Sequence, residues 1–300
     1  MLEQVLREKN RTMEEIASSI FVETNYPGVN VGVVATKEGL ICVDAPSCPA
    51  DAQEWVNRLR GTFDAPIRFL ILTDCHVDRA INASAFGARV IAHQETHARL
   101  KGYAAQFPAP LVEGISTRYS LAREELDSAP VVLPQITFCN QATIILGDRR
   151  LTVSHFPSAT HGSLWVSSEE EQVLFVGDTI VVDSHPFLGE ADSKAWLDAL
   201  VHLRRERFQV QVLVPGRGSL CEKSATEPVS AYIRLVRRRV HALHRAGRPR
   251  ADTTSLIPGF IDRFPHDDVP MEWLQKQLKI SLDHVYDEYK EADAATLSES

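Results

Sequence analysis

The chain of 300 residues has no apolar run long enough to cross a membrane and no cysteines in Cys-x-x-Cys spacing. The first absence argues against a membrane-spanning protein. The five cysteines are odd in number, which fits reduced thiols better than a disulfide framework. The first nineteen residues alternate in charge and lack the apolar segment of a secretory signal. We therefore expect a cytoplasmic protein that does not bind membranes.

Positive charge is also scarce, because 32 lysines and arginines stand against 40 acidic residues. The net charge of −8 and the pI near 5.8 argue against nucleic acid as a partner, since phosphate backbones need a positive surface. One basic cluster, Arg234–Arg250, can form a local anion-binding patch or contact a partner protein. A solvated helix face with a basic C-terminal end is the simpler interpretation.

Hydrophobic residues make up 44% of the chain and charged residues 24%, which is typical of a globular protein. Short apolar and β-branched runs predict a first group of strands at 19–22, 30–35, 40–43, 67–73 and 89–92. A second strand-rich half is predicted at 135–138, 142–146, 150–155, 163–167, 172–176 and 210–214. Helices are predicted at 50–60, 194–206, 227–246 and 271–292.

This alternation favours an α/β fold, a four-layer αββα sandwich. We predict a single domain over residues 1–300, with a core at about 18–220 and a helical C-terminal extension at about 225–295.

Five motifs follow one another at plausible spacings. They are VNVG with GLICVD at 29–44, TDCHVDR at 73–79, PSATHGSL at 157–164, LFVGDT at 174–179 and VPGRG at 214–218. Together they resemble the metallo-β-lactamase superfamily, whose second motif reads Thr-His-x-His-x-Asp-His and whose fifth reads Val-Pro-Gly-His-Gly. The resemblance covers roughly residues 20–220. It implies the αββα sandwich and an ancestral hydrolytic role, like that of the family's thioesterases, lactonases and glyoxalases.

Members of that family hold two metal ions, usually zinc, which activate water and polarise the scissile group. The resemblance places the first site at Asp74, His76 and Ala159, the second at Asp78, Arg79 and Arg217, and the bridging carboxylate at Asp178. Four of these seven positions hold a residue other than the family's. Alanine has no ligand atom, and a guanidinium stays protonated and offers only donors.

The substitutions compensate one another in charge. Arg79 and Arg217 can pair with Asp78 and Asp178, whose burial without any cation would cost several kcal/mol. We therefore predict a hydrolase-like protein with a degenerate dinuclear site and no metal cofactor, either a pseudoenzyme or an enzyme with a metal-independent route. Arg79, Arg217 and His161 are predicted to form a pocket for a small anionic molecule.

Two alternatives remain open. Asp74, His76, Asp78 and Asp178 keep ligand atoms, so a mononuclear hydrolase of esters, lactones or thioesters can hold zinc, manganese or iron on Asp74, His76 and Asp178. His161 is then a candidate substitute ligand. A non-catalytic ligand sensor or assembly subunit would instead use the basic segment 234–250. Asp78 and His161 are the candidate catalytic groups, and the sequence names neither a substrate nor an oligomeric state.

Overall fold

The computed structural model describes residues 13–205, 209–266 and 269–298, and its strands form two sheets. The first sheet has the strand order β1 to β7. Its strands are β1 (Glu14–Ala17), β2 (Ile20–Glu23), β3 (Val31–Thr36), β4 (Gly39–Val43), β5 (Ile67–Ile71), β6 (Arg89–His93) and β7 (Ile136–Phe138). The pairs from β1 to β4 are antiparallel and those from β4 to β7 are parallel.

The second sheet has the order β12-β11-β10-β9-β8. Its strands are β8 (Gln141–Leu146), β9 (Arg149–His155), β10 (Leu164–Ser168), β11 (Val173–Val181) and β12 (Val212–Arg217). All neighbours are antiparallel except β11 and β12, which run parallel. Each sheet therefore has a pair of parallel strands whose carboxyl ends open at one edge, where loops collect functional side chains.

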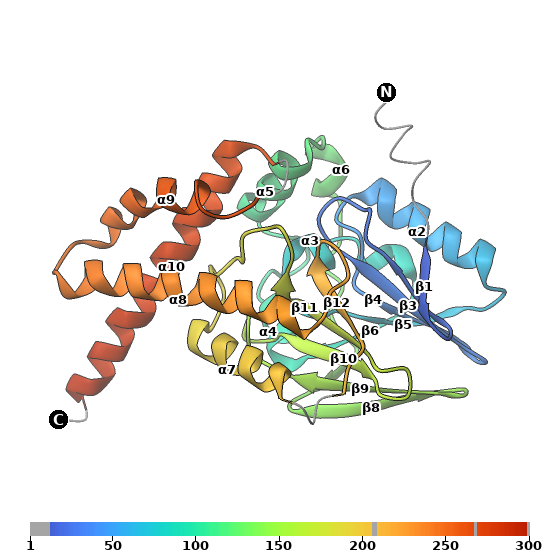
Figure 1. The fold of residues 1–300 in the computed structure, drawn as a ribbon. Helices are drawn as coiled ribbons and strands as arrows, with labels where there is room; N and C mark the ends of the chain where they lie inside the picture. The colour runs from blue at the N-terminus through green and yellow to red at the C-terminus, as the bar shows by residue number, and fades with distance from the viewer. Residues whose placement is uncertain (1–12, 206–208, 267–268, 299–300) are drawn as a thin grey trace.

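Helices cover the outer faces of the two sheets (Figure 1). Those on the first sheet's side are α2 (Pro49–Thr62), α3 (Val77–Ala80), η1 (Ala83–Phe86), α4 (Gln94–Lys101), α5 (Ala109–Tyr119) and α6 (Glu124–Asp127). Those after β11 are α7 (Ser193–Arg204), η2 (Lys223–Ala225), α8 (Thr226–Arg245), η3 (Arg250–Leu256), α9 (Ile257–Ile261) and α10 (Met271–Ser298).

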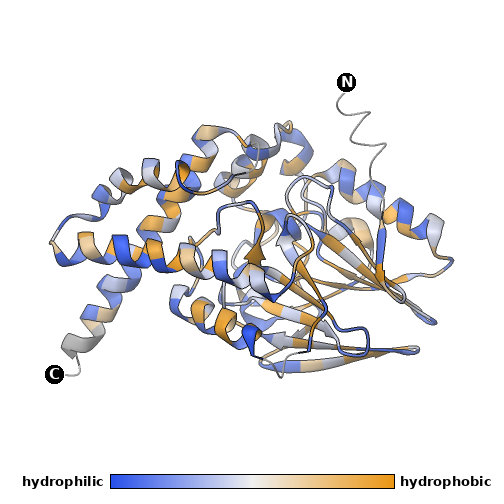
Figure 2. Cartoon of the chain, viewed as in Figure 1, coloured by the Kyte–Doolittle hydropathy of each residue, from blue (hydrophilic) through white to orange (hydrophobic). Residues whose placement is uncertain are grey.

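Three hydrophobic clusters hold these layers together. One lies between the sheets and joins side chains such as Val34 and Ile41 to Val153 and Phe175. A second packs α2 on the first sheet, and a third packs α7, α8 and α10 on the second sheet, around Trp196. Hydrophobic residues recur along many of the strands and along parts of the helices (Figure 2). The predicted four-layer αββα sandwich is confirmed, and the C-terminal helices share the core of the second sheet.

Besides β1, which was not predicted, two strand assignments differ from the sequence prediction. Residues 135–138 were expected in the second half, but β7 pairs in parallel with β6 and extends the first sheet. Strand β11 runs on to Val181, whereas the prediction ended it at 176. Gly177 has a φ of 53° and the register shifts there, so the strand continues through an irregularity. As a result Asp178 lies within a buried strand.

The basic segment 234–250 belongs largely to α8, and several of its cations face acidic residues of α10. Arg237 lies 3.1 Å from Glu288, and Arg250 lies 3.1 Å from Asp283 and 2.9 Å from Asp287. The pair of Arg237 joins α8 to α10, and the two pairs of Arg250 join η3 to α10. In the part of the chain that the structure describes, no helix is both long and apolar enough to span a bilayer.

Candidate functional site

The sequence motifs converge at the ends of the parallel strands of both sheets. Asp44 follows β4, the segment 73–79 follows β5, Asp178 lies in β11 and Arg217 closes β12. Two glycines let these strands approach the site. A Cβ on Gly177 would lie 2.6 Å from Thr73 Oγ1, and one on Gly216 would lie 2.1 Å from Asp178 Oδ1. The backbone is therefore built to bring Asp178 against its neighbours.

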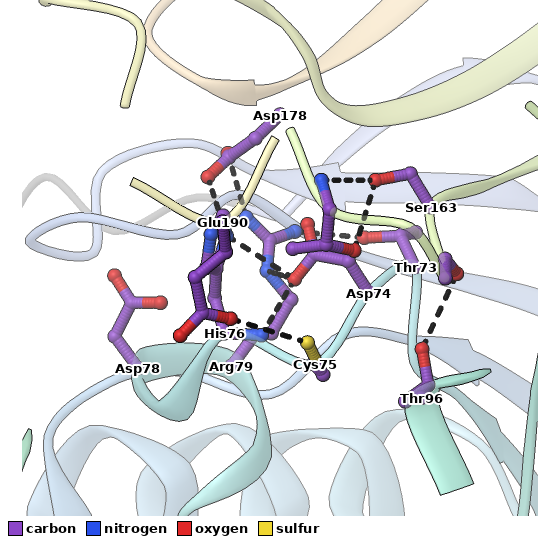
Figure 3. A network of polar contacts seen from close by, with 12 residues as sticks. Thr73, Asp74, Cys75, His76, Asp78, Arg79, Thr96, Ser163, Asp178 and Glu190 are labelled. Carbon is purple, nitrogen blue, oxygen red and sulfur yellow. Dashed lines mark hydrogen bonds and ion pairs between the residues drawn. The ribbon is translucent and has the colours of Figure 1, made fainter. Parts of the chain in front are cut away.

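Arg79 is the centre of a buried ion-pair cluster (Figure 3). Its side chain is 0% exposed. Its Nη1 lies 2.8 Å from Asp44 Oδ2, its Nε 2.9 Å from Asp74 Oδ1 and its Nη2 2.6 Å from Asp178 Oδ1. Nη1 also donates to Thr73 Oγ1 at 2.7 Å. Although burial opposes the charge, the carboxylates of Asp178, Asp74 and Asp44 hold the pKa of Arg79 well above its usual value.

Asp44 is a member of this cluster that the sequence analysis did not single out. Thr73 donates to it twice, from the backbone nitrogen at 2.8 Å and from the hydroxyl at 2.6 Å. Its φ of 57° lies in the left-handed region, which Asp tolerates better than most residues. Burial raises the pKa of Asp44 to about 6, while Arg79 acts in the opposite direction. The signal for this residue was its place at the end of the GLICVD strand.

Arg217 forms the second half of the cluster. Its Nη2 donates to Asp78 Oδ2 at 2.7 Å and to Asp178 Oδ2 at 3.0 Å. Burial favours protonation of both carboxyls, but the charges of Arg217 and Arg79, joined by Arg118 at Asp78 and by His76 at Asp178, keep their pKa values below the usual one. Arg118, a residue of α5 that the sequence analysis missed, brings its Nη1 to 3.7 Å from Asp78. Trp273 of α10 covers that guanidinium at 4.6 Å.

His76 lies between two carboxylates. Its Nδ1 is 3.3 Å from both Asp74 Oδ1 and Asp178 Oδ2. Burial alone would lower the pKa of His76, but the charge of Asp74 and the hydrogen bond to Asp178 raise it to about 10. Asp74, His76 and Asp178 place one ligand atom each within 4.8 Å of one another, the one such group found among the described residues. Both carboxylates of this group are also partners of Arg79.

The charges of the cluster balance one another. Four aspartates (44, 74, 78 and 178) face three arginines (79, 118 and 217) and the protonated His76. Ala159, at the position where the family motif has histidine, is 0% exposed and offers no ligand atom. The predicted pairing of arginines with the retained carboxylates is therefore present, with Arg79 bound to Asp44 and Asp74 in addition to Asp178.

The three residues predicted to form an anion pocket do not line one cavity. Arg217 lines a cavity of about 290 Å³, whereas the exposed His161 lines a neighbouring one of about 360 Å³. Arg79 is fully buried and lines neither. Between the cavities stands Glu190, which pairs with Arg99 at 2.7 Å and lies 3.6 Å from the sulfur of Cys75. The structure thus separates His161 from the cluster.

The cavity that contains Arg217 has a charged floor and apolar walls. Its floor is made of His76, Asp78, Arg118, Asp178 and Arg217. The walls come mainly from α5 and α10 and from the loop after β11, with side chains that include Leu111, Ile115, Phe187, Trp273, Leu274 and Leu278. Such a shape admits a molecule with one polar end and one apolar end.

Residues 25–216 match the family described as the metallo-beta-lactamase superfamily, and this span contains the motif positions discussed above except Arg217 and Gly218, which directly follow it. The chain belongs to the metallo-β-lactamase superfamily. A match of this extent also accounts for the five motifs and for the two-sheet architecture.

Among curated superfamily proteins, the chain is similar to acyl-coenzyme A thioesterase MBLAC2. It is 25% identical to the Bos taurus protein over 162 residues, which are 49% of this chain and 54% of that protein. It is 30% identical to the Homo sapiens protein over 89 residues, which are 28% of this chain and 32% of that protein. The chain therefore spans about half or less of the length of these relatives.

Solved structures of the superfamily share the fold. The metallo-beta-lactamase from Pontibacter korlensis is 18% identical, with a TM-score of 0.61, and the match covers 75% of this chain and 99% of that one. The sec-alkylsulfatase Pisa1 from Pseudomonas sp. is 12% identical, with a TM-score of 0.69, and the match covers 93% of this chain and 50% of that one. At these identities the likeness concerns the fold alone.

Proposed function

We propose that this superfamily member has replaced its metal centre with an ion-pair cluster and binds a small anion in the cavity above it. It is then a hydrolase-like protein that works, if it is catalytic, without a bound metal. The observation that carries the proposal is the position of Arg79, which offers its three nitrogens to Asp44, Asp74 and Asp178. A guanidinium cannot ligate a metal, and here it uses the carboxylates that a metal would need.

A divalent ion fits these residues poorly. On Asp74, His76 and Asp178 it would find three protein ligands, two of which already pair with Arg79. At roughly 5 Å from the guanidinium, a doubly charged ion would be repelled by on the order of 5 kcal/mol at an effective dielectric constant of about 20. The cluster is electrically neutral without such an ion, so the carboxylates gain little from binding one.

The anion site is best assigned to His76 and Arg217. Both side chains are only 10% exposed and line the cavity. His76 Nε2 and Arg217 Nη1 are buried and have no hydrogen-bond partner among the described residues. Buried donors without partners are costly, so a ligand that accepts from them binds favourably. Arg79 then has a structural role and does not contact the ligand.

The metal content of the purified protein tests this proposal. Protein prepared without chelator is expected to contain far less than one zinc, iron or manganese ion per chain, and its Tm should not change with EDTA or added zinc. An ion at 100 times its Kd would stabilise the fold by about 2.7 kcal/mol, which is easily measured. A near-stoichiometric metal content would contradict the proposal.

A second candidate is a mononuclear metal-dependent hydrolase. It is favoured by the close approach of the ligand atoms of Asp74, His76 and Asp178, all within 4.8 Å. Since the curated relatives are named acyl-coenzyme A thioesterases, acyl thioesters are the first substrates to assay. In this case His76→Ala and Asp178→Asn should each abolish both the bound metal and hydrolysis. Glu190→Gln, at the neighbouring cavity, is the control and should keep both. Unaltered activity in the first two variants rules this candidate out.

A non-catalytic ligand sensor is consistent with the same anion site. An assembly role for the basic segment has less support, because Arg237 and Arg250 already pair with acidic residues of α10. We also propose a reducing compartment such as the cytoplasm, which the five free cysteines support.

A further inference from the structure

We infer that the cavity above the cluster binds an aliphatic monocarboxylate, with the carboxylate on His76 and Arg217 and the alkyl chain between α5 and α10. The inference rests on the proposed function, because it uses the anion site assigned there. It adds the chemical class of the ligand: one negative charge joined to one unbranched apolar chain.

The donors at the floor suit a carboxylate. His76 Nε2 and Arg217 Nη1 are both buried without partners and belong to side chains that line the cavity. A carboxylate has two oxygens and can accept from two donors at once, and hydrogen bonds between charged groups are the strong ones. A hydroxyl could accept from the same donors, but it would bring no charge.

The charges around the cavity favour a single negative charge on the ligand. Arg217 and Arg118 lie beside the carboxylates of the floor, and Glu190 is paired with Arg99. Lys276 of α10 lies exposed on the lining and adds one positive charge. One carboxylate can therefore bind beside Arg217 while adding only a single negative charge to a lining that already holds Asp78 and Asp178. A dianion such as a phosphate monoester would leave an excess negative charge beside Asp78 and Asp178.

The walls suit an alkyl chain. Leu111 and Ile115 of α5 line the cavity together with Leu274 and Leu278 of α10. Ile280, also on the lining, is 38% exposed, which is unusual for a large apolar side chain. A volume of about 290 Å³ lies at the small end of the roughly 300–1,000 Å³ of small-molecule sites, so the chain it admits is short to medium in length.

Contacts between side chains link the apolar wall of the cavity to its charged floor. Trp273 of α10 stacks on Arg118 at 4.6 Å, and Arg118 lies 3.7 Å from Asp78 at the charged floor. Helix α10, which forms one apolar wall, is thereby positioned relative to the carboxylate site. The apolar wall and the charged floor can thus act on one ligand molecule.

Gly114 offers a way to fill the cavity without disturbing the cluster. It lines the cavity from helix α5, and a Cβ added there would meet no atom within 4 Å. Gly114→Leu therefore extends a side chain into open space and also removes a helix-weakening glycine. Gly61, in helix α2, has equally free space around its Cβ but does not line the cavity. Gly61→Leu is the matched control.

The test is calorimetric titration of the full chain with three ligands that share an eight-carbon chain: octanoate, octan-1-ol and octyltrimethylammonium. Octanoate is expected to bind about tenfold or more tightly than the other two, because only it makes charge-assisted hydrogen bonds with the floor. Shortening the acid from eight to six carbons should weaken binding about fourfold per methylene removed. Gly114→Leu should weaken octanoate binding at least about tenfold, and Gly61→Leu should leave it within about twofold.

Equal binding of octanoate and octan-1-ol would overturn the charged part of the inference, and chain-length-independent binding would overturn the apolar part. Unchanged binding in Gly114→Leu would place the ligand elsewhere. These failures are distinct from failure of the proposed function. A metal-free protein that does not bind octanoate refutes only this inference, whereas a stoichiometric metal refutes the proposed function whatever octanoate does.

Discussion

Replacing Arg79 by methionine is expected to lower the free energy of unfolding by about 3–5 kcal/mol or more. Methionine fills a similar volume but leaves Asp44, Asp74 and Asp178 without their shared cation in a site that excludes water. Domains are typically stable by only about 5–15 kcal/mol, so much of the variant should be insoluble or unfolded at 37 °C. Urea unfolding followed by circular dichroism, together with the soluble fraction after expression, measures the effect.

Arg99→Met is the control for this prediction. Arg99 also pairs with a carboxylate, that of Glu190 at 2.7 Å, but its side chain is 51% exposed. An exposed pair contributes at most about 1 kcal/mol, so this variant should unfold close to the parent. Arg79→Lys should fall between the two, because it keeps the charge but cannot reach three carboxylates in the same way. Equal stability of Arg79→Met and Arg99→Met would mean that the buried cluster is not held by Arg79.

The second large effect is a gain of metal in the quadruple variant that restores the family's ligands, with Asp74→His, Arg79→His, Ala159→His and Arg217→His. Neutral imidazoles would replace both guanidiniums that compete for Asp78 and Asp178. Structural zinc sites in peptides bind with apparent free energies of about 10–16 kcal/mol, so the variant should take up zinc and gain a large increase in Tm on its addition. Elemental analysis and thermal unfolding with and without zinc measure this.

The triple variant that retains Arg79 is the control and should not bind zinc, since the guanidinium of Arg79 stays paired with Asp178 and places a positive charge beside the zinc site. If the quadruple variant also fails to bind zinc while remaining folded, the cause lies in the geometry. Ala159 is completely buried among apolar neighbours, so in that case overpacking by the imidazole at this position would be the cause to test first.

The architecture could be predicted well from the sequence, because the spacing of apolar residues within each short segment indicates whether that segment forms a strand or a helix. The pairing of Arg217 with Asp78 and Asp178 could also be predicted, because the motif positions are neighbours in the fold family. For Arg79, the expected partners were Asp78 and Asp178. It contacts Asp178, but its other ion-pair partners at close range are Asp44 and Asp74. Which carboxylate a guanidinium reaches depends on the rotamer of the arginine and on the relative positions of the strand ends that carry the carboxylates, and these strands belong to two different sheets.

Other parts of the site depend on long-range packing that no local pattern encodes. Arg118 and Trp273 are 155 positions apart in the chain, and they meet only because α10 crosses to α5. His161 was placed near the arginines because its motif is near theirs, but its side chain is exposed at the neighbouring cavity. A loop position alone does not fix the direction in which a side chain points.

The cation at the centre of this site is part of the polypeptide. A metal centre is filled only after synthesis, and its occupancy follows the supply of free ions in the compartment. Arg79 is instead synthesised as part of the chain. Its ion pairs join Asp44 after β4, Asp74 after β5 and Asp178 in β11 as the protein folds. The steady-state amount of folded protein should therefore stay constant when cells are starved of zinc, iron or manganese.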